Sequence, residues 1–498
     1  MAAAKDMPHA ASRIQSWWIP RYRVYTLGVL MGLAWFVPML DFMRRGLRGD
    51  FWWVWASGQW MAVHHQLLMK NPAAWNGSGL GGKTWVNLEW GWEWILYHLN
   101  PHQTPLVFLM ILFALELLMA AALFWAMATL APKLSIEIKA GLYLVYAAFV
   151  FPFTVKLRAE MFSYIAFPLL LGILWRARRD VRWLALLVPL TVIWANIHGS
   201  WLLIPALTGL EALRRVARKE WRDAGWALTG GILGPVAAAV LFTPFHLRTL
   251  TYAWWLDHNH WITTYIQEWQ SVNFHQTIFL VWAAAIILSW MWRARSGVRY
   301  PWLLDVWMLG TTVAFFEEAR MVTYFGEVFI LWWAYGLGRD DRRREFLGTR
   351  GESATRIGLG AAGLLALVLC MGFGMQTRSH YTAPEVPRQL VSWVNQRSHG
   401  VVLAPVDVGG YLIAHHMHGV FLDGRSDFFL ANGRRFQQYV AMIGAGARER
   451  QLARDFSSDH VTLVLWPQGQ LTANLAGYLT RSHFHEAARA GKWAVWAR

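Results

Sequence analysis

The chain has 498 residues, of which 56% are hydrophobic and only 15% are charged. A soluble chain of this length would show two or three cores separated by polar surface, whereas this one shows apolar blocks flanked by short basic runs, which is typical of a polytopic membrane protein. The net charge of +16 does not indicate a nucleic-acid partner, because the Lys and Arg residues lie between the apolar blocks. The single cysteine, Cys370, excludes an intrachain disulfide.

The first part of the chain predicts a cytoplasmic segment followed by a long membrane domain. Residues 1–24 are polar and basic, and the apolar stretch after them lacks a small-residue cleavage site, so we expect an uncleaved first helix. Residues 25–376 form the predicted membrane domain, with a large first outer loop at 43–104. Its predicted spans are Tyr25–Phe42, Pro105–Leu130, Ala140–Val155, Met161–Trp175, Trp183–Ile197, Trp201–Leu213, Trp226–Phe242, Thr277–Trp292, Pro301–Phe316, Met321–Leu337 and Ile357–Met375.

The short spans on either side of His198 leave two possibilities open. Trp183–Ile197 and Trp201–Leu213 are shorter than the roughly 20 residues that a helix needs to cross a bilayer. They either span the membrane or form a re-entrant hairpin that is buried in protein.

The basic residues predict the orientation of the spans. Four strongly basic loops fall on one side, which the positive-inside tendency assigns to the cytoplasm. They are "RARRDVR" (176–182), "RRVARKEWR" (214–222), "RARSGVR" (293–299) and "GRDDRRRE" (338–345). The N-terminus is then cytoplasmic, and residues 377–498 lie outside. Three arginines beside Asp50 fall on the outer side, where the rule expects few basic residues. They either serve a function there or extend their charged ends to the membrane surface. They are Arg44, Arg45 and Arg48.

Residues 377–498 predict a small extracytoplasmic α/β domain. Four apolar runs have the length and composition of strands, and Pro387–Gln396 is predicted to be one of the helices between them. The runs are "GVVLAP" (400–405), "GVFLDG" (419–424), "VTLVLWP" (461–467) and "KWAVWA" (492–497). The expected fold is therefore an α-helical polytopic membrane protein of about 11 transmembrane helices with a small α/β domain at its C-terminal end.

Ionisable residues gather at the predicted outer ends of the helices. In the first outer loop, Glu89 and Glu93 are four residues apart, so a helix would carry both carboxylates on one face. The other ionisable residues on this side are Asp50, His64, His65, Arg158, Glu160, His198, His246, His258, His260, Glu268, Glu317, Glu318 and Arg320. Each residue alone has an ordinary structural explanation. The joint pattern favours a functional site, because ionisable groups at membrane depth are costly and are usually paired or functional.

Several stretches resemble a group of bacterial polytopic proteins related to the GT-C superfamily of membrane glycosyltransferases. The matching stretches follow the same order over most of the chain. They are "DFWW" (50–53), Gly58, "TWVNLEW" (84–90), "RAEMFS" (158–163), "WANIHGSW" (194–201), "IQEWQS" (266–271) and "GGYL…DGR" (409–425). Where this group usually has a His three residues after its "DFW", this chain has Val54 or Trp55, so His64 or His65 would have to replace that side chain.

The resemblance implies a GT-C-like membrane domain in the bacterial cytoplasmic membrane that takes a polyprenyl-phosphate or diphosphate sugar as donor. The acceptor would be a hydroxyl of an envelope glycan, lipid or protein, as in the assembly of a cell-envelope polysaccharide. In such enzymes a first-loop Asp lies in the active site, so Asp50 would be the general base or a metal ligand. Glu89 is the second candidate ligand for a divalent cation, Mg²⁺ or Mn²⁺.

The residue types fit the chemistry that the resemblance implies. Transfer needs a base for the acceptor hydroxyl and positive charge for the departing phosphate. Asp50, Glu89 and His198 are the expected catalytic residues. The expected substrate-binding residues are Arg158, Glu160, Glu93, Glu268, Glu317 and Arg320. Arg158 and Arg320 are suited to phosphate, because a guanidinium matches it in a bidentate manner.

Two other functions stay open at this point. A transporter or flippase for a lipid-linked sugar or small solute would use carboxylates inside the spans, namely Glu116, Asp305 and Glu327. A non-catalytic partner in a polysaccharide assembly complex would tolerate changes at the expected catalytic residues. The sequence shows no internal repeat of the kind that many transporters have.

Overall fold

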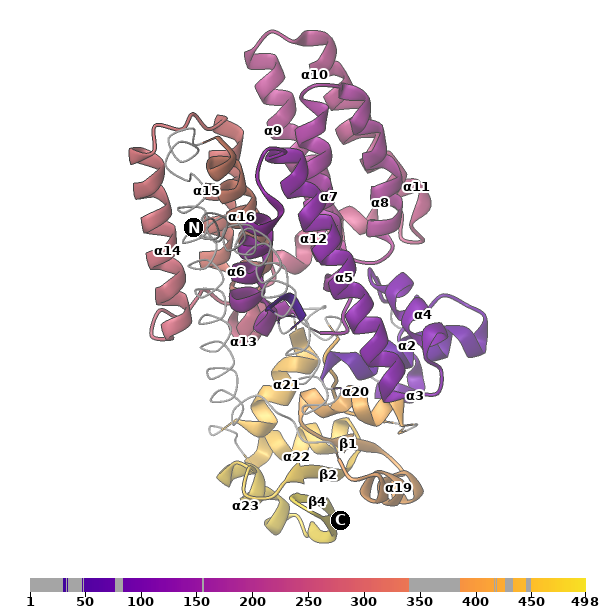
Figure 1. Cartoon of the computed structure of the whole chain (residues 1–498). Helices are drawn as coiled ribbons and strands as arrows, with labels where there is room; N and C mark the ends of the chain where they lie inside the picture. Colours follow the sequence, from indigo (N-terminus) through magenta and orange to yellow (C-terminus); the bar gives the residue numbers. More distant parts are fainter. Residues whose placement is uncertain are drawn as a thin grey trace, which may run out of the picture.

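The computed structural model describes residues 30–32, 34, 47, 49–76, 84–154, 156–339, 386–415, 417, 419–425, 433–444 and 449–498. A long helical part lies above a smaller part that contains a sheet (Figure 1). Several predicted segments fall wholly or mostly outside the described residues. They are residues 1–24, the spans Tyr25–Phe42 and Ile357–Met375, the basic loop 338–345 and the group Arg44, Arg45 and Arg48.

The first outer loop folds into three helices between the two parts. They are α2 (Asp50–His64), α3 (Ala73–Asn76) and α4 (Trp90–Leu99). Helix α2 begins at Asp50 because Gly49 adopts a φ of 56°, which glycine tolerates, and because an acidic side chain is favourable in the first helical turn. Helices α2 and α4 pack closely at Gly58, where any side chain would overlap the backbone oxygen of Glu93.

The helical part contains the following elements in chain order. They are α5 (Pro105–Leu130), α6 (Ile136–Thr154), α7 (Glu160–Ala177), α8 (Leu187–Ala195), α9 (Leu203–Ala217), α10 (Trp221–Leu228), α11 (Gly234–Phe242), α12 (Arg248–Asp257), α13 (His260–Tyr265), α14 (Thr277–Arg295), α15 (Trp302–Glu317) and α16 (Val322–Arg339). One π-helical turn, Thr229–Leu233, joins α10 to α11. Short 3-10 turns lie at Val181–Leu186, Gly199–Leu202, Gln267–Trp269 and Ala319–Met321.

Four helical stretches in the described part are long and apolar enough to cross a membrane. They are Leu106–Leu130, Glu160–Ala177, Trp221–Phe242 and Thr277–Arg295. Each coincides with a predicted span, and the fold is therefore that of a polytopic membrane protein. The predicted number of eleven spans stays a prediction. The two short predicted spans around His198 fold as a 3-10 turn followed by a short α-helix in each case.

The basic turns lie at the end of the helical part that is farthest from the sheet. Figure 1 shows the turn between α9 and α10 and the turn between α14 and α15 at the top, and the C-terminal domain at the bottom. This separation agrees with the predicted charge distribution along the chain. The cytoplasmic position of the basic end stays a prediction.

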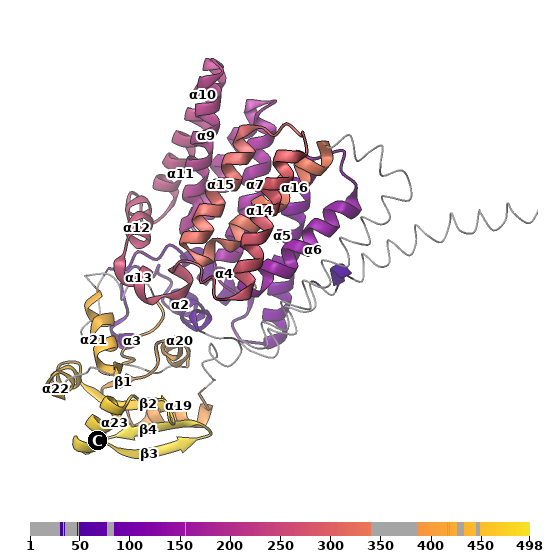
Figure 2. The ribbon, with the colours of Figure 1, turned by 90° about the vertical axis from the view of Figure 1, so that its left-hand side faces the viewer.

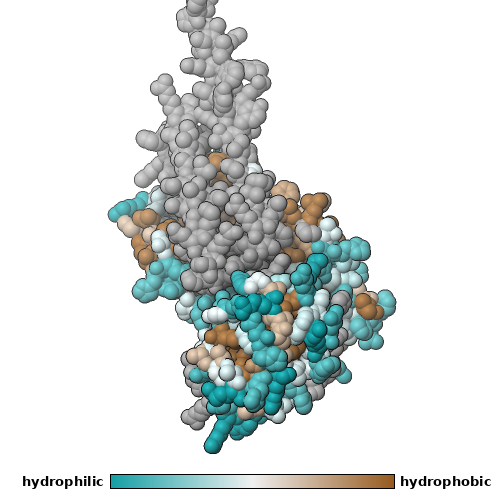
Figure 3. Space-filling model, turned by 90° about the horizontal axis from the view of Figure 1, so that it is seen from below, coloured by the Kyte–Doolittle hydropathy of each residue, from teal (hydrophilic) through white to brown (hydrophobic). Residues whose placement is uncertain are grey.

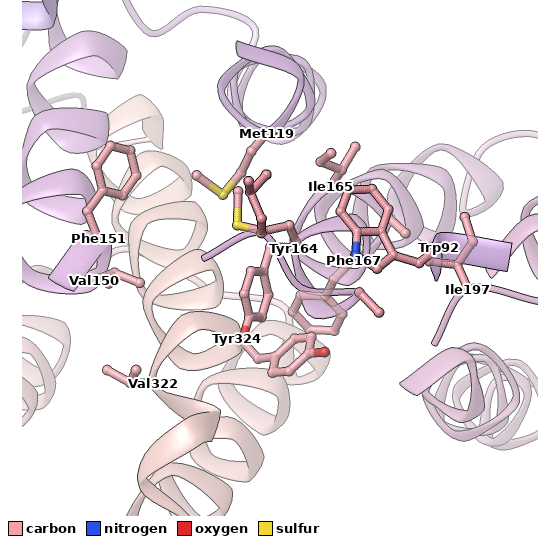
Figure 4. Close-up of a cluster of buried hydrophobic side chains, with 14 of the residues drawn as sticks. Trp92, Met119, Val150, Phe151, Tyr164, Ile165, Phe167, Ile197, Val322 and Tyr324 are labelled. Atoms are coloured by element: carbon pink, nitrogen blue, oxygen red, sulfur yellow. The ribbon is translucent and has the colours of Figure 1, made fainter. Parts of the chain in front are cut away.

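Aromatic and aliphatic side chains from α4, α5, α6, α7 and α16 and from the turn after α8 pack in one buried cluster (Figure 4). The labelled residues are Trp92, Met119, Val150, Phe151, Tyr164, Ile165, Phe167, Ile197, Val322 and Tyr324. The same apolar core continues into the C-terminal domain, where the rings of Trp52 and Tyr411 meet edge to face with centroids 5.1 Å apart. The two parts are therefore packed on each other through α2.

The C-terminal domain is built on a four-stranded mixed sheet (Figure 2). Strand β1 (Val401–Leu403) pairs in parallel with β2 (Val461–Pro467), and β4 (Trp493–Ala497) pairs antiparallel with both β2 and β3 (His485–Ala490). The strand order is β1-β2-β4-β3. The helices are α19 (Arg388–Arg397), α20 (Val406–Ala414), α21 (Arg434–Ile443), α22 (Glu449–Ser458) and α23 (Ala473–Arg481). From below, the described surface is mostly hydrophilic or neutral, with hydrophobic patches (Figure 3).

The predicted strands of this domain are only partly correct. The runs 400–405, 461–467 and 492–497 contain β1, β2 and β4. The run 419–424 is wrong as a strand, because it makes a single bridge to β1 and the N–H of Val420 donates to Trp75 in the first outer loop instead. Strand β3 was not predicted, because "HEAARA" has few residues that favour strands.

Candidate active site

A single arginine joins three outer segments of the chain. Arg158 lies in the turn before α7, and each of its nitrogen groups meets a different carboxylate. Nη2 is 2.9 Å from Asp50 Oδ2, Nε is 3.2 Å from Glu160 Oε2 and Nη1 is 3.3 Å from Glu268 Oε2. The first turn of α2, the start of α7 and the 3-10 turn Gln267–Trp269 therefore converge on one guanidinium, below the helical core and beside the C-terminal domain.

Asp50 makes a hydrogen bond in addition to its ion pair with Arg158. Its Oδ1 accepts a hydrogen bond of 3.2 Å from the indole nitrogen of Trp53, one turn later in α2. Burial raises the pKa of Asp50, while the neighbouring Arg158 lowers it in part and the Glu268 charge raises it further. The Asp50 side chain is still 28% exposed. A reachable carboxylate with a raised pKa is a stronger general base than a fully solvated one.

The two glutamates of the first outer loop have separate environments. Burial raises the pKa of Glu89 to about 8, and the nearby Glu160 charge adds to this rise, so Glu89 is mainly protonated at pH 7. Glu93 is fully buried in the first turn of α4, where it accepts a 2.5 Å hydrogen bond from the Asn87 side chain. Glu89 immediately precedes α4 and interacts with the charges around Arg158, whereas the Glu93 side chain is bound by Asn87 in the interior.

His198 belongs to a buried polar network beside the carboxylates. The backbone N–H of Ser200 donates to His198 Nδ1 at 3.3 Å, and the hydroxyl of Ser163 lies 3.0 Å from the same nitrogen. Burial lowers the pKa of His198 to about 4, so the ring is neutral at pH 7. Because Nδ1 accepts from a backbone N–H, the proton of the neutral ring is on Nε2. His198 is therefore suited to donating a hydrogen bond rather than to acting as a base.

Ser163 and Tyr324 complete this network, and the sequence analysis did not single them out. The indole of Trp194 donates to Ser163 Oγ at 2.8 Å, and Ser200 Oγ donates to the same oxygen at 2.8 Å. Tyr324 in α16 donates to Ser200 Oγ at 3.0 Å. Ser163 lies one turn after Glu160 on α7, and both fall in the stretch "RAEMFS" (158–163), which could have linked the network to the carboxylates.

Arg320 lies against the 3-10 turn that carries Glu268. Its guanidinium covers the ring of Trp269, with 3.0 Å between Cζ and the ring centroid, and its Nε donates to Glu318 at 2.7 Å. Glu318, rather than Glu317, is thus the acidic partner of Arg320. Glu317 is exposed at the end of α15.

His64 and His65, the expected replacements for a histidine at the position of Val54 or Trp55, lie far from that position. His64 and His65 are exposed at the C-terminal end of α2, and the ring of His64 stacks on Trp60. The helix rise of about 1.5 Å per residue puts them roughly 20 Å from Asp50. Neither can substitute for a side chain close to Asp50.

The "DGR" turn of the C-terminal domain reaches the first outer loop. Arg425 is fully buried and pairs with Asp423 at 2.8 Å. Its two terminal nitrogens donate to the side-chain oxygens of Asn71 at 2.7 Å and Asn76 at 2.6 Å. Asp423 and Arg425 therefore connect two parts of the molecule instead of facing a ligand.

The carboxylates around Arg158 do not fit a divalent cation in this arrangement. Mg²⁺ and similar ions need several oxygens directed at one point at about 2.1 Å, and the guanidinium occupies the position on which these oxygens converge. In the described part of the chain, no group of three or more His, Cys, Asp or Glu side chains is arranged to hold a metal ion.

The overall fold matches solved membrane glycosyltransferases. The apo oligosaccharyltransferase of Archaeoglobus fulgidus aligns with 90% of this chain and 70% of its own, with a TM-score of 0.64 and 10% identity. The same enzyme, AglB, in complex with an inhibitory peptide and a dolichol-phosphate, aligns with a TM-score of 0.58, 10% identity and the same coverage. ArnT from Cupriavidus metallidurans, bound to undecaprenyl phosphate, aligns with 96% of this chain and 98% of its own, with a TM-score of 0.56 and 12% identity.

Sequence comparison adds no closer relationship. No protein-family model matches the chain, and no curated protein is detectably similar to it in sequence. Both solved enzymes are GT-C glycosyltransferases, and the identities of 10% and 12% show a shared fold alone. The chain therefore has the GT-C fold.

Proposed function

We propose that the chain is a bacterial membrane glycosyltransferase of the GT-C type. It moves a sugar from a polyprenyl-phosphate-linked donor to an acceptor hydroxyl outside the cytoplasmic membrane. The observation that carries the proposal is the 2.9 Å pair between Asp50 and Arg158, which lies at the junction of the two parts of a GT-C fold. The lipid phosphates bound to ArnT and AglB support a lipid-linked donor.

Asp50 is the general base in this proposal. The acceptor oxygen attacks the anomeric carbon, the bond from that carbon to the phosphate oxygen breaks, and the hydroxyl proton passes to Asp50. Asp50 is available for this step because its side chain remains partly exposed and its pKa is raised by burial. Arg158 fixes the orientation of the carboxylate through the ion pair.

The phosphate needs partners other than Arg158, because all three nitrogen groups of that guanidinium already meet carboxylates. Lys156 is the first candidate, since its side chain is half exposed and its nitrogen is 3.8 Å from Glu268. Arg320, which is held on Trp269, is the second. The Nε2–H of the neutral His198 ring is a third, uncharged donor. Together they supply positive charge and hydrogen bonds for the leaving oxygens.

The remaining acidic residues have complementary roles toward the sugar. Arg158 holds the pKa of Glu268 down to about 2, so this carboxylate accepts hydrogen bonds from sugar hydroxyls. Glu89, whose pKa burial raises to about 8, donates a hydrogen bond when protonated. Glu160 keeps Arg158 in place from the start of α7.

A transporter function receives little support from the carboxylates inside the helices. Asp305 pairs with Arg293 at 3.2 Å and accepts a hydrogen bond from the indole of Trp332 at 3.0 Å, so it has a structural role. Glu327 accepts a hydrogen bond from Tyr146 at 3.4 Å. Glu116 is fully buried in α5.

Label transfer from a panel of polyprenyl-phosphate sugars to envelope acceptors tests the proposal. Wild type in nanodiscs should transfer label, and Asp50→Asn should lose at least about a thousandfold in rate because the base is gone. Glu449→Gln, which removes an exposed pair with Arg481 on the C-terminal domain, is the matched control and should keep full activity. Transfer retained by Asp50→Asn would exclude Asp50 as the general base. Movement of labelled lipid across proteoliposome leaflets without transfer would favour the flippase.

A further inference from the structure

Arg158 lies among three acidic side chains in the candidate active site. Asp50, Glu160 and Glu268 each contact Arg158 directly. Three carboxylates from separate segments are thus gathered around a position where a divalent cation would otherwise be expected.

The guanidinium makes the contacts that such an ion would make. It is planar and carries five N–H donors in a fixed fork, so it can hold three carboxylates from three directions at once. Its Nε, Nη1 and Nη2 atoms are each used by a different acid, at 3.2, 3.3 and 2.9 Å. Arg158 therefore links α2, α7 and the Gln267–Trp269 turn as a metal ion links its ligands.

The surroundings of Asp50 keep its carboxylate turned toward Arg158. Its second oxygen accepts from the indole of Trp53 and lies against Gly424 of the C-terminal domain. Lys156 adds a second positive charge, 3.8 Å from Glu268. Two cations from one short turn thus offset most of the charge of the three acids that contact Arg158.

We infer that Arg158 takes the place of a divalent cation in this site, so that the protein holds its acidic cluster together without Mg²⁺ or Mn²⁺. Any role of Arg158 in catalysis rests on the proposed glycosyltransferase function. The claim that the carboxylates bind Arg158 and not a metal ion does not depend on that function. Removing the guanidinium should convert the same carboxylates into a site for a divalent ion.

Binding of Mn²⁺ to the full chain in nanodiscs, followed by electron paramagnetic resonance, tests the inference without any transfer assay. Wild type should bind no Mn²⁺ specifically. Arg158→Ala should bind Mn²⁺ at least about tenfold more tightly than wild type, because Asp50, Glu160 and Glu268 lose their shared cation. The double variant Arg158→Ala/Glu268→Gln should lose this gain. Arg158→Lys, which keeps a positive charge, should resemble wild type.

Two results would overturn the inference. One is Mn²⁺ bound by wild type and released by Glu268→Gln, which would mean that Arg158 gives way to a metal ion. The other is a folded Arg158→Ala that binds Mn²⁺ no better than wild type. If Arg158→Ala does not fold, the wild-type and Glu268→Gln titrations decide the question alone. Absence of transfer activity in the same samples would bear on the proposed function and not on these titrations.

Discussion

Gly424 of the C-terminal domain lies directly against the carboxylate of Asp50, so that a Cβ atom at this position would overlap Asp50 Oδ1. Gly410 in α20 is almost as close to the backbone of Trp53, where an added Cβ would be 2.9 Å from the nitrogen. Helix α20 packs along α2, and both are visible at the junction of the two parts in Figure 2. The C-terminal domain thus forms one wall of the Asp50 site, and only residues without a side chain fit there.

Gly424→Ala should therefore reduce activity more than stability. The added methyl group displaces the Asp50 carboxylate, which can move because it is a side chain and not backbone. A misplacement of a catalytic group by about 1 Å can cost roughly a hundredfold in rate. We expect a loss of about ten- to a hundredfold in kcat with a small change in unfolding midpoint. Gly310→Ala in α15, where an added Cβ meets nothing within 4 Å, should leave kcat unchanged. Full activity in Gly424→Ala would contradict the contact.

Arg425→Ala should destabilise the protein strongly. The guanidinium lies between the rings of Trp75 and Trp85, 4.9 and 5.0 Å from their centroids, and its removal leaves Asp423 buried without its cation. Breaking a buried ion pair in this way costs about 3–5 kcal/mol. We expect a clearly lower unfolding midpoint in detergent or nanodiscs.

The matched control for this variant is Arg481→Ala. Arg481 pairs with Glu449 at 2.9 Å, but both side chains are more than half exposed. Exposed pairs contribute about 0–1 kcal/mol, so the midpoint should hardly change. Equal effects of the two substitutions would mean that Arg425 does not connect the domain to the first outer loop.

Ser163→Ala should lower stability by removing a shared acceptor. Ser163 Oγ accepts from the indole of Trp194 and from Ser200 Oγ, and the Trp194 side chain is fully buried. A buried donor left without its partner costs about 1–3 kcal/mol. The thermal unfolding midpoint should fall, whereas Ser271→Ala on the exposed surface should leave it unchanged. An unchanged midpoint in Ser163→Ala would show that another acceptor replaces the hydroxyl.

The helices could be predicted closely because their limits depend on local sequence. Helix α5 begins and ends at the predicted residues, since Pro105 is favourable at a helix start and the apolar run stops at Leu130. The sequence also predicted Asp50, Arg158 and Glu268 at helix ends on the same side, and the three side chains meet in the structure.

The partners within the site could not be predicted, because they come from segments that are distant in the sequence. Arg425 and Asn71 are 354 residues apart, and no local pattern relates them. Glu93 was expected beside Glu89 because a spacing of four suits a helix, and its N–H does bond to the Glu89 carbonyl, but the Glu93 side chain is fully buried against Asn87. The divalent-cation site predicted at Asp50 and Glu89 stays a prediction, and nothing in the sequence indicated that Arg158 would lie against Asp50.

Glu89→Gln should remove a pH dependence of stability. The pKa of this glutamate is about 4.5 in an unfolded chain and about 8 in the folded protein, where burial favours the protonated form. Between these values the folded state binds more protons than the unfolded state, so the free energy of unfolding falls as pH rises. The contribution of protonated Glu89 to that free energy is lost fully only above about pH 8. His198, whose pKa burial lowers to about 4, has the opposite effect, but only below its ordinary value of 6.5. In the interval from pH 6.5 to 8, the difference in slope between wild type and Glu89→Gln therefore reports on Glu89 without a contribution from His198.

Thermal unfolding midpoints of the purified protein at several pH values in this interval provide the measurement. We expect the wild-type midpoint to fall toward pH 8 and that of Glu89→Gln to fall less steeply, because the amide cannot lose a proton in either state. Glu449→Gln on the surface of the C-terminal domain should keep the wild-type slope. A wild-type slope in Glu89→Gln would assign the pH dependence to another group, and Glu89 would then be ionised at pH 7 and lose its place as a hydrogen-bond donor in the site.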